Sequence, residues 1–230
     1  MRAIEVIGVT KDYVDRGRVV TRALRGVDLA VEKGEFMAIA GPSGSGKTTL
    51  LNLIGALDTA TLGTIRVDGR DIVGLPQKEL SDLRRDRIGF VFQAYNLVPV
   101  LTAAENAEYV MELKGLPAVE RRRRIAELFE RMGIGDLMQA RPHEMSGGQQ
   151  QRVAVARAIA SEPAIVLADE PTANLDQATG RSLVALMHEL NRERRVTFVF
   201  STHDPMVLAQ ADRVVRLVDG KVSSDERRAT

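Results

Sequence analysis

The sequence predicts an α/β fold built on a mainly parallel sheet, and three features of the chain lead to this prediction. Short apolar runs alternate with segments of helical periodicity over most of the 230 residues, as in strands joined by helical crossovers. From about residue 93 to 160 the patterns are helical only, which indicates a helical lobe inserted into the α/β core. The N-terminal segment carries the runs RVV and VDLAVE, which indicate an antiparallel strand addition.

Five segments are expected to form strands because they are short, apolar and bounded by turn residues. The clearest is EFMAIA at 35–40, which has a glycine directly before it and another directly after it. The others are IGFVFQ at 88–93, AIVLAD at 164–169, VTFVFS at 196–201 and RVVRLVDG, a strand and a turn, at 213–220.

Helices are expected between these strands. Thr102 is placed to cap a helix that ends near Gly115, and a second helix opens at Pro117 and stops at Gly133. The apolar residues of this second helix recur at helical spacing and predict one buried face: Ile125, Leu128, Phe129 and Met132. The remaining expected helices cover 48–57, about 147–160, and about eighteen residues before the strand at 196–201.

Composition excludes several classes of function. Thirty-two basic residues face thirty-one acidic ones, so the net charge of +1 does not favour nucleic acid, and no such partner is expected. The absence of cysteine excludes a disulfide framework, a thiolate metal site and a cysteine nucleophile. The chain has no run of about 18 apolar residues and no secretory signal, so a cytoplasmic protein is expected.

The four arginines at 121–124 have two interpretations. Glu120 with Arg124, Arg123 with Glu127, and Glu127 with Arg131 are spaced to pair along a helix, which favours a solvated helix face. A patch that binds nucleic acid or anionic lipid is the alternative.

The segment GPSGSGKTT is the strongest functional signal, because it matches the phosphate-binding loop and lies between a predicted strand and a predicted helix. Glycines let the backbone curl so that N–H groups point at phosphate oxygens, and the helix N-terminus adds positive potential. The Lys47 ammonium is placed to reach the β- and γ-phosphates, and the Thr48 hydroxyl is a suitable ligand for Mg²⁺. The nucleotide-binding residues are Gly41, Pro42, Ser43, Gly44, Ser45, Gly46, Lys47, Thr48 and Thr49.

The segment IVLADEPT adds two carboxylates at the end of a buried strand. Asp169 is placed to hold Mg²⁺ through water, and Glu170 can orient or deprotonate an attacking water. Two adjacent carboxylates there fit hydrolysis better than transfer to a substrate hydroxyl. The alternative is a pair of surface acids that open a turn before Pro171.

The segment MSGGQQQRVAVARAI at 145–159 resembles the signature motif of ATP-binding-cassette (ABC) ATPases, with Met145 where leucine is usual. The resemblance implies a P-loop NTPase (RecA-like) core, ATP as substrate and Mg²⁺ as cofactor. It also implies a homodimer on ATP binding, in which the signature of one chain closes on the partner's ATP. The signature residues are Ser146, Gly147, Gly148 and Gln149.

The remaining family motifs occur in the family's order. The resemblance implies that Gln93 is the glutamine that links metal and water to the transport domain, and that Asp176 in ANLD crosses the dimer interface. It implies that His203 in STHD contacts the γ-phosphate, although a lone histidine is more often structural. Tyr13 stands where the family places an aromatic ring on adenine, and the alternative is a packing residue at a strand edge.

The resemblance also divides the chain, which we expect to be one domain over 1–230. The nucleotide-binding core covers about 1–92 and 161–222, and the helical lobe about 93–160. Residues 223–230 are expected to form a frayed polar tail.

A finer resemblance lies in GFVFQAYNLVPVLTAAENAE at 89–108 and in ADEPTANLD, which are similar to the lipoprotein-release and macrolide-exporter group. Ala173 replaces that group's usual glycine. The resemblance implies an integral membrane transporter subunit as partner, and a place on the inner face of the cell membrane. An importer ATPase and an ABC ATPase of DNA repair or translation are the alternatives. Leu97 and Val98 either pack under the following helix or line a docking groove for the membrane subunit.

Overall fold

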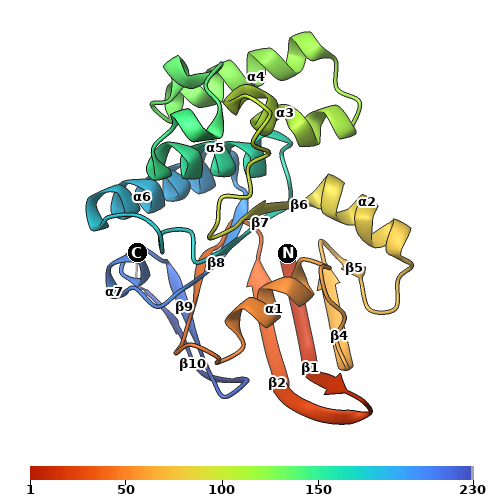
Figure 1. Cartoon of the computed structure of the whole chain (residues 1–230). Helices are drawn as coiled ribbons and strands as arrows, with labels where there is room; N and C mark the ends of the chain where they lie inside the picture. Colours follow the sequence, from red (N-terminus) through yellow and green to blue (C-terminus); the bar gives the residue numbers. More distant parts are fainter. Residues whose placement is uncertain (229–230) are drawn as a thin grey trace.

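A six-stranded sheet lies at the centre of the computed structural model, which describes residues 1–228 (Figure 1). Its strands follow the order β10-β9-β3-β8-β7-β6, and all neighbours from β9 to β6 are parallel. β10 pairs antiparallel with β9 at one edge. The bounds are β3 (Phe36–Ala40), β6 (Ile88–Val91), β7 (Ile165–Asp169), β8 (Thr197–Thr202), β9 (Arg213–Val218) and β10 (Lys221–Arg227).

A second, antiparallel sheet is formed mainly by the N-terminal part of the chain, in the order β2-β1-β4-β5. Its two long strands are β1 (Arg2–Asp15) and β2 (Arg18–Glu32), as the sequence predicted, and β4 (Leu62–Val67) and β5 (Arg70–Asp71) extend it. Helix α1 (Lys47–Ile54) contacts strands of both sheets.

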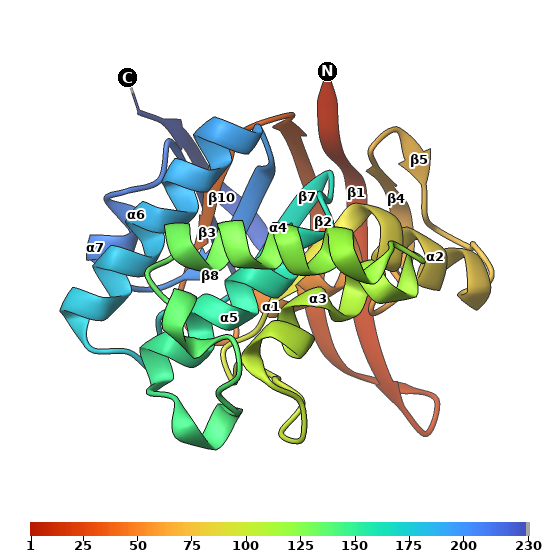
Figure 2. The same cartoon turned by 90° about the horizontal axis from the view of Figure 1, so that it is seen from above.

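The lobe predicted at 93–160 consists of helices that stack above the central sheet. Figure 2 shows α4 lying over α3 and α5 when the molecule is viewed from above. α5 contacts β6 and α6, so the lobe is packed directly on the core. The bounds are α3 (Ala103–Leu113), α4 (Ala118–Arg131), α5 (Gly147–Ala160), α6 (Gln177–Arg194) and α7 (Pro205–Leu208), with short 3₁₀ turns at Gly135–Leu137 and Pro142–Glu144.

Two hydrophobic clusters cover the two faces of the parallel sheet. Side chains of β3 alternate between them: Phe36 packs with the lobe, whereas Met37 packs with α1 and the antiparallel sheet. Burial on both faces explains why this strand reads as a continuous apolar run in the sequence. The predicted apolar face of α4 is confirmed, because Ile125, Leu128, Phe129 and Met132 are all buried.

Local signals placed the lobe helices correctly. The Thr102 hydroxyl accepts from the Glu105 N–H at 3.2 Å, and the Glu105 carboxylate accepts from the Thr102 N–H at 2.8 Å. This capping box begins α3 where the sequence predicted it. β4, β5 and α2 (Gln77–Arg87) were not predicted, because only two α2 residues are buried and the strands alternate weakly.

The expectation of a frayed tail at 223–230 was wrong for residues 223–227. Residues up to Arg227 belong to β10, and residues 229 and 230 lie outside the described part of the chain. Arg213, a largely buried residue of β9, forms an ion pair of 2.6 Å with Asp225 of β10 and one of 2.9 Å with Glu35. Backbone pairing and these charges hold in place a segment whose polar composition suggested disorder.

Three of the four arginines at 121–124, namely Arg121, Arg123 and Arg124, form ion pairs with nearby acids. Arg123 pairs with Glu120 and Glu127 at 2.9 and 2.7 Å, and Arg124 pairs with Glu120 at 2.6 Å. Hydrogen bonds from these two arginines lower the pKa of Glu120 to about 2. Arg131 was expected to pair with Glu127, but it pairs with Glu193 of α6. These contacts support the interpretation of a solvated, paired helix face.

No helix within residues 1–228 combines the length and the apolar character needed to cross a bilayer.

Candidate active site

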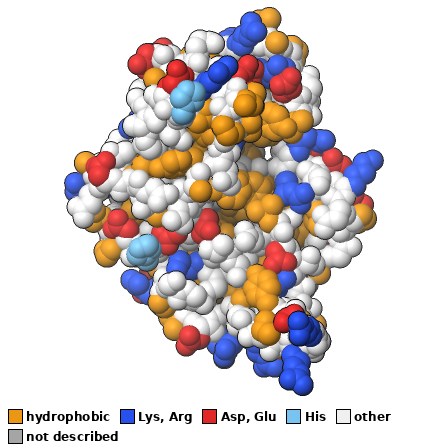
Figure 3. Space-filling view, in the orientation of Figure 1, with side chains coloured by type: hydrophobic (Ala, Val, Ile, Leu, Met, Phe, Trp, Pro, Cys, Tyr) orange, Lys and Arg blue, Asp and Glu red, His pale blue; other side chains and the backbone are white. Residues whose placement is uncertain are grey.

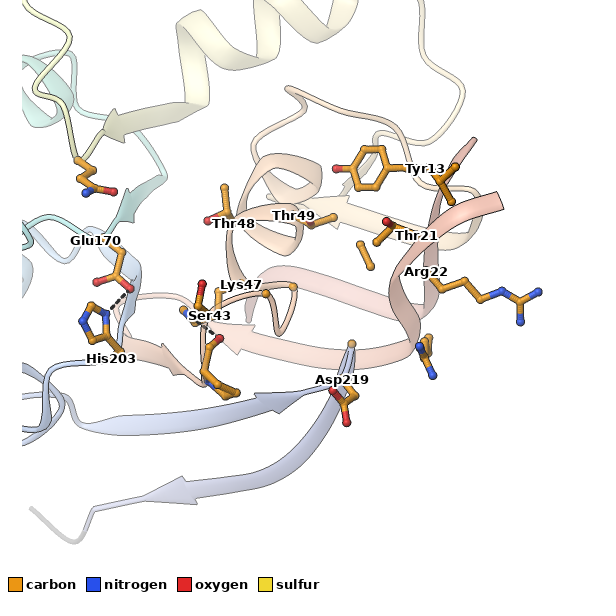
Figure 4. Close-up of a pocket in the computed structure, with 18 of the residues that line it drawn as sticks. Tyr13, Thr21, Arg22, Ser43, Lys47, Thr48, Thr49, Glu170, His203 and Asp219 are labelled. Carbon is orange, nitrogen blue, oxygen red and sulfur yellow. Dashed lines mark hydrogen bonds and ion pairs between the residues drawn. The ribbon is translucent and has the colours of Figure 1, made fainter. Parts of the chain in front are cut away.

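A cleft of about 960 Å³ lies at the carboxyl ends of the parallel strands, and Figure 4 shows most of its lining. Strands β3, β8, β7 and β6 are consecutive neighbours in the sheet, so the segments that follow them meet at one edge. The antiparallel sheet supplies the other wall. Predicted residues in the lining are Tyr13, Pro42, Ser43, Gly44, Gly46, Lys47, Thr48, Thr49, Gln93, Glu170 and His203.

The predicted phosphate loop connects β3 to α1. Gly46, with φ of 103°, is the N-cap residue, and α1 begins at Lys47. A Cβ atom on Gly41 would collide with the Leu217 carbonyl oxygen, so only glycine fits there. The Lys47 ammonium donates to the carbonyl oxygens of Gly41 and Pro42 at 2.8 and 3.0 Å, which holds it across the loop. The loop therefore presents an ammonium and a helix N-terminus on the cleft wall, a suitable site for phosphate.

The predicted metal residues from two distant segments lie together. The Thr48 hydroxyl donates to Asp169 Oδ1 at 3.1 Å, and the Ser201 hydroxyl donates to the same oxygen at 2.5 Å. No cluster of three or more histidine and carboxylate side chains within residues 1–228 is arranged to hold a metal alone. The Thr48 and Asp169 oxygens nevertheless fit a hard cation whose other ligands are phosphate and water.

Glu170 begins the loop after β7 and is held in the left-handed region, with φ of 46°. Its N–H donates to the carbonyl and hydroxyl oxygens of Ser201 at 3.2 and 3.0 Å. The Glu170 carboxylate points to His203, and Oε1 lies 2.9 Å from Nδ1 (Figure 4). β7 and β8 therefore bring the two predicted catalytic side chains into contact.

Tyr13 lies at the opposite end of the cleft from Glu170 and His203 (Figure 4). Its hydroxyl donates to Asp58 at 3.1 Å, and the Lys11 ammonium lies 4.9 Å from the ring centroid and 2.6 Å from Asp58. Partial burial raises the pKa of Asp58, but hydrogen bonds from Lys11, the Thr59 N–H and Tyr13 bring it below its ordinary value. The ring is thus oriented by a charged pair while 39% of the residue stays exposed.

Gln93 lines the cleft two residues after β6 ends at Val91, not at the end of the strand as expected. Its carbonyl oxygen accepts from the Asn174 amide at 2.9 Å. This contact ties the loop after β6 to the loop after β7, which carries Glu170.

The model of the ABC transporter family matches residues 24–173, a segment that includes the phosphate loop, Asp169 and Glu170. The chain belongs to the ABC transporter family. It is 46% identical to an uncharacterized ABC transporter ATP-binding protein of Thermotoga maritima, over 99% of this chain and 96% of that protein. It is 48% identical to the lipoprotein-releasing system ATP-binding protein LolD of Anaeromyxobacter dehalogenans, over 96% of this chain and 93% of LolD.

Two further comparisons extend this result. The chain is 46% identical to the macrolide export ATP-binding/permease protein MacB 1/2 of Paracoccus denitrificans, but it spans only 33% of that protein. Among solved structures, a dimer of the ATP-binding cassette MJ0796 bound to ADP and Pi has a TM-score of 0.90 and 42% identity, and the similarity covers 99% of this chain and 100% of that one. The predicted family and fold are confirmed, and the chain is an ABC ATPase that hydrolyses ATP to ADP and phosphate.

The signature of this ABC ATPase lies outside the cleft. Ser146 caps α5, and Gln149 closes a capping box with it, so Gly147 and Gly148 open the helix. Asp176 caps α6 through the N–H groups of Ala178 and Thr179, and hydrogen bonds from Thr179 lower its pKa. None of the predicted signature residues, nor Asp176, lines the cleft of its own chain.

Several residues of the site were not predicted. Ser201 binds Asp169 and the Glu170 N–H, and Asn174 binds Gln93. Thr21, Arg22 and Asp219 line the cleft from β2 and the β9–β10 turn. Ser201 lies in β8, which the sequence placed to within one residue, but the neighbouring strand β7 was needed to show that Ser201 faces Asp169.

Proposed function

We propose that this chain powers an export-type transporter by closing as a dimer around two MgATP molecules. The observation that carries this proposal is the contact of 2.9 Å between Glu170 and His203, at the end of the cleft opposite Tyr13, and the phosphate loop lines the same cleft. Glu170 follows Asp169 directly, and Asp169 contacts Thr48. This position suits Glu170 to act on the water that attacks the γ-phosphate.

Each side chain of the cleft has a role in this proposal. The loop amides and Lys47 bind the phosphates, and Tyr13 stacks on adenine. Thr48, Asp169 and Gln93 would hold Mg²⁺, which would neutralise phosphate charge. Glu170 orients or deprotonates the water, and His203 helps to bind the γ-phosphate and stabilise its developing charge.

The second half of each ATP site comes from the partner chain. Ser146, Gly147, Gly148 and Gln149 lie outside this chain's cleft, at the partly exposed N-terminus of α5, where the helix dipole favours a phosphate. The ATP-binding cassette MJ0796 forms dimers in solved structures, which supports this arrangement. Asp176, which caps the N-terminus of α6, would lie in the same dimer interface.

A membrane subunit of the lipoprotein-release or macrolide-export type is the proposed partner. Relatives named for these systems, LolD and MacB, match 96% and 97% of this chain, respectively. The chain would then act in the cytoplasm on the inner face of the membrane. Its core, 1–92 and 161–222, would bind nucleotide, while the lobe, 93–160, would contact the partner.

A groove between the lobe and the core is the proposed contact surface, and Figure 3 shows hydrophobic side chains gathered there. Its apolar lining includes Leu57, Phe90, Tyr109 and Leu113, and its charged lining is basic, with no aspartate or glutamate. Arg157 donates to the carbonyl oxygens of Tyr95 and Asn96, and burial lowers its pKa. A short cytoplasmic helix of the membrane subunit, with apolar side chains and a carboxylate, complements this lining.

Leu97 and Val98 do not line this groove. Leu97 packs against the lobe core, and Val98 is fixed by hydrogen bonds between its backbone and Asn106, while 39% of the residue is exposed. These contacts favour the packing interpretation for Leu97. The docking surface that we propose is instead the groove lined by Leu57, Phe90, Tyr109 and Leu113.

The substitution Glu170→Gln tests the proposed chemistry. It keeps the size of the side chain but removes the base, so MgATP should still bind while turnover is lost, and ATP should hold two chains together. Light scattering after size exclusion measures the dimer, and phosphate release measures turnover. Glu127→Gln, at an exposed position of α4, is the control. A Glu170→Gln variant that hydrolyses like wild type, or stays monomeric with MgATP, would contradict the proposal.

A further inference from the structure

Gln151 lies in the second turn of α5, and its side-chain amide is fully buried. The side-chain hydrogen bonds of Gln151 are made to residues outside α5. Its Nε2 donates to the Pro171 carbonyl oxygen at 2.7 Å and makes a longer contact of 3.5 Å with the Phe92 carbonyl oxygen. Both carbonyl oxygens face Nε2, and this fixes the orientation of the amide. The flipped amide would place its own oxygen, Oε1, against the two carbonyl oxygens. Oε1 has no hydrogen-bond partner among the described residues. A buried amide left half satisfied is costly, so an apolar residue would fit this core position better if packing were its only purpose.

The two carbonyl groups belong to the loops that carry the proposed catalytic side chains. Pro171 follows Glu170 directly, and Phe92 precedes Gln93 directly. Glu170 is held at φ of 46°, a conformation that costs energy unless its surroundings hold it in place. Pro171 has no N–H, so its carbonyl oxygen is the only backbone polar group of this residue that a hydrogen bond can hold.

The neighbouring glutamines do not share this role. Gln149 accepts from the Ser146 N–H at 2.8 Å, and Gln150 donates to the Met145 carbonyl oxygen at 3.1 Å, so both act at the start of their own helix. Gln151 extends from the same helix to the loop behind Glu170. α5 thus begins at the signature and contacts the catalytic loop less than two turns later.

We propose that Gln151 is a positioning residue that links the signature helix to Glu170 of the same chain. This inference rests on the proposed role of Glu170. In the proposed dimer, the signature of a chain faces its partner's ATP, whereas Glu170 acts on the chain's own ATP. A shift of α5 when the signature engages one nucleotide moves Pro171, and so adjusts Glu170 at the other. Gln151 couples the two sites by one hydrogen bond.

Two substitutions at Gln151 test the proposal, with phosphate release and titration of a fluorescent ATP analogue as readouts. Gln151→Met keeps volume but removes the donor, so kcat should fall about tenfold or more, because a small displacement of a reacting group is costly. Nucleotide affinity should change little. Gln151→Glu places a carboxyl group against two carbonyl oxygens, and only its protonated form can donate to Pro171. Its kcat relative to wild type should therefore rise as pH falls from about 8 to about 6, whereas the ratio for Gln151→Met stays flat.

Asn191→Leu is the matched control. Asn191 also has a buried side-chain amide, which donates to the backbone carbonyl oxygens of Gly34 and Val196 at 2.9 and 2.7 Å. These two residues precede β3 and β8, so they lie at the amino ends of the strands, away from the cleft. Its loss should lower the melting temperature without lowering kcat at a temperature where the variant is folded.

Three outcomes would overturn the proposal: wild-type kcat in Gln151→Met, pH-independent and equal defects in both Gln151 variants, or an equal loss of kcat in Asn191→Leu. If Gln151→Met does not fold, the pH response of Gln151→Glu decides the question. Glu170→Gln is measured in parallel. Wild-type hydrolysis in that variant would contradict the role of Glu170 itself, whatever the result at Gln151.

Discussion

The Nδ1 atom of His203 lies 2.9 Å from the Oε1 atom of Glu170, although the two residues follow different strands. The carboxylate side chain is only 16% exposed, and the imidazole is 71% exposed. The Glu170 N–H donates to Ser201 and its carboxylate is mostly buried, so the exposed imidazole of His203 has more room to reorient than the carboxylate has.

The pair should behave as one unit in catalysis. We expect His203→Ala and Glu170→Gln each to lose most of the turnover, and the double variant to lose no more than the stronger single variant. Groups that act in the same step give non-additive losses. Single-turnover hydrolysis with saturating MgATP measures all three variants. Losses that multiply in the double variant would show that the two residues act independently.

Tyr13 should contribute to binding through its ring. Tyr13→Ala should weaken nucleotide binding by about 0.5–1.5 kcal/mol, the usual value of an aromatic contact. Tyr13→Phe keeps the ring and loses only the partly exposed hydrogen bond to Asp58, so its effect should be much smaller. Titration with a fluorescent ATP analogue compares the two. Equal losses in both variants would contradict stacking on adenine.

The groove between lobe and core should be required for assembly with the membrane subunit. Leu113 is 55% exposed and lines this groove, so Leu113→Asp should abolish co-purification with the membrane subunit of the same transporter. Basal ATP hydrolysis and circular dichroism of the isolated chain should remain close to wild type. Val119→Asp is the control, because Val119 is an exposed apolar residue of α4 outside the groove. Intact co-purification of Leu113→Asp would refute the docking surface.

The ion pair between Arg213 and Asp225 should make stability depend on acid. Hydrogen bonds from Arg213 lower the pKa of Asp225, so the folded state binds fewer protons than the unfolded state near pH 4. The stabilisation is complete above the unfolded-state pKa of about 3.9 and is lost as pH falls through the lower folded-state value. Asp225→Asn should lower the free energy of unfolding by about 1 kcal/mol at neutral pH, a modest value because Asp225 is partly exposed.

Urea unfolding of wild type and Asp225→Asn from neutral to acid pH checks this prediction. The difference in unfolding free energy should stay constant down to about pH 5 and shrink below about pH 4. The neighbouring substitution Glu226→Gln on β10 serves as the control. A difference that grows as pH falls would show that the sign of the linkage is wrong.

The sequence by itself determined the features that depend on local pattern. The phosphate loop at 41–49, the acidic pair at the end of β7 and the Thr102 cap could each be predicted because a few adjacent residues carry the whole signal. The alternation of apolar runs and helical periodicity predicted the α/β fold and its helical lobe, and the order of the motifs determined the family.

Only the tertiary structure decided which distant residues meet. The contacts of Ser201 with Asp169, Tyr13 with Asp58 and Gln151 with Pro171 depend on strand order and on the placement of α5, which no local pattern specifies. β10 shows the same limit: its polar residues predict a loose tail, but pairing with β9 and the contact with Arg213 make it a strand. Local propensity is weak at such positions, so long-range pairing and charge determine the structure.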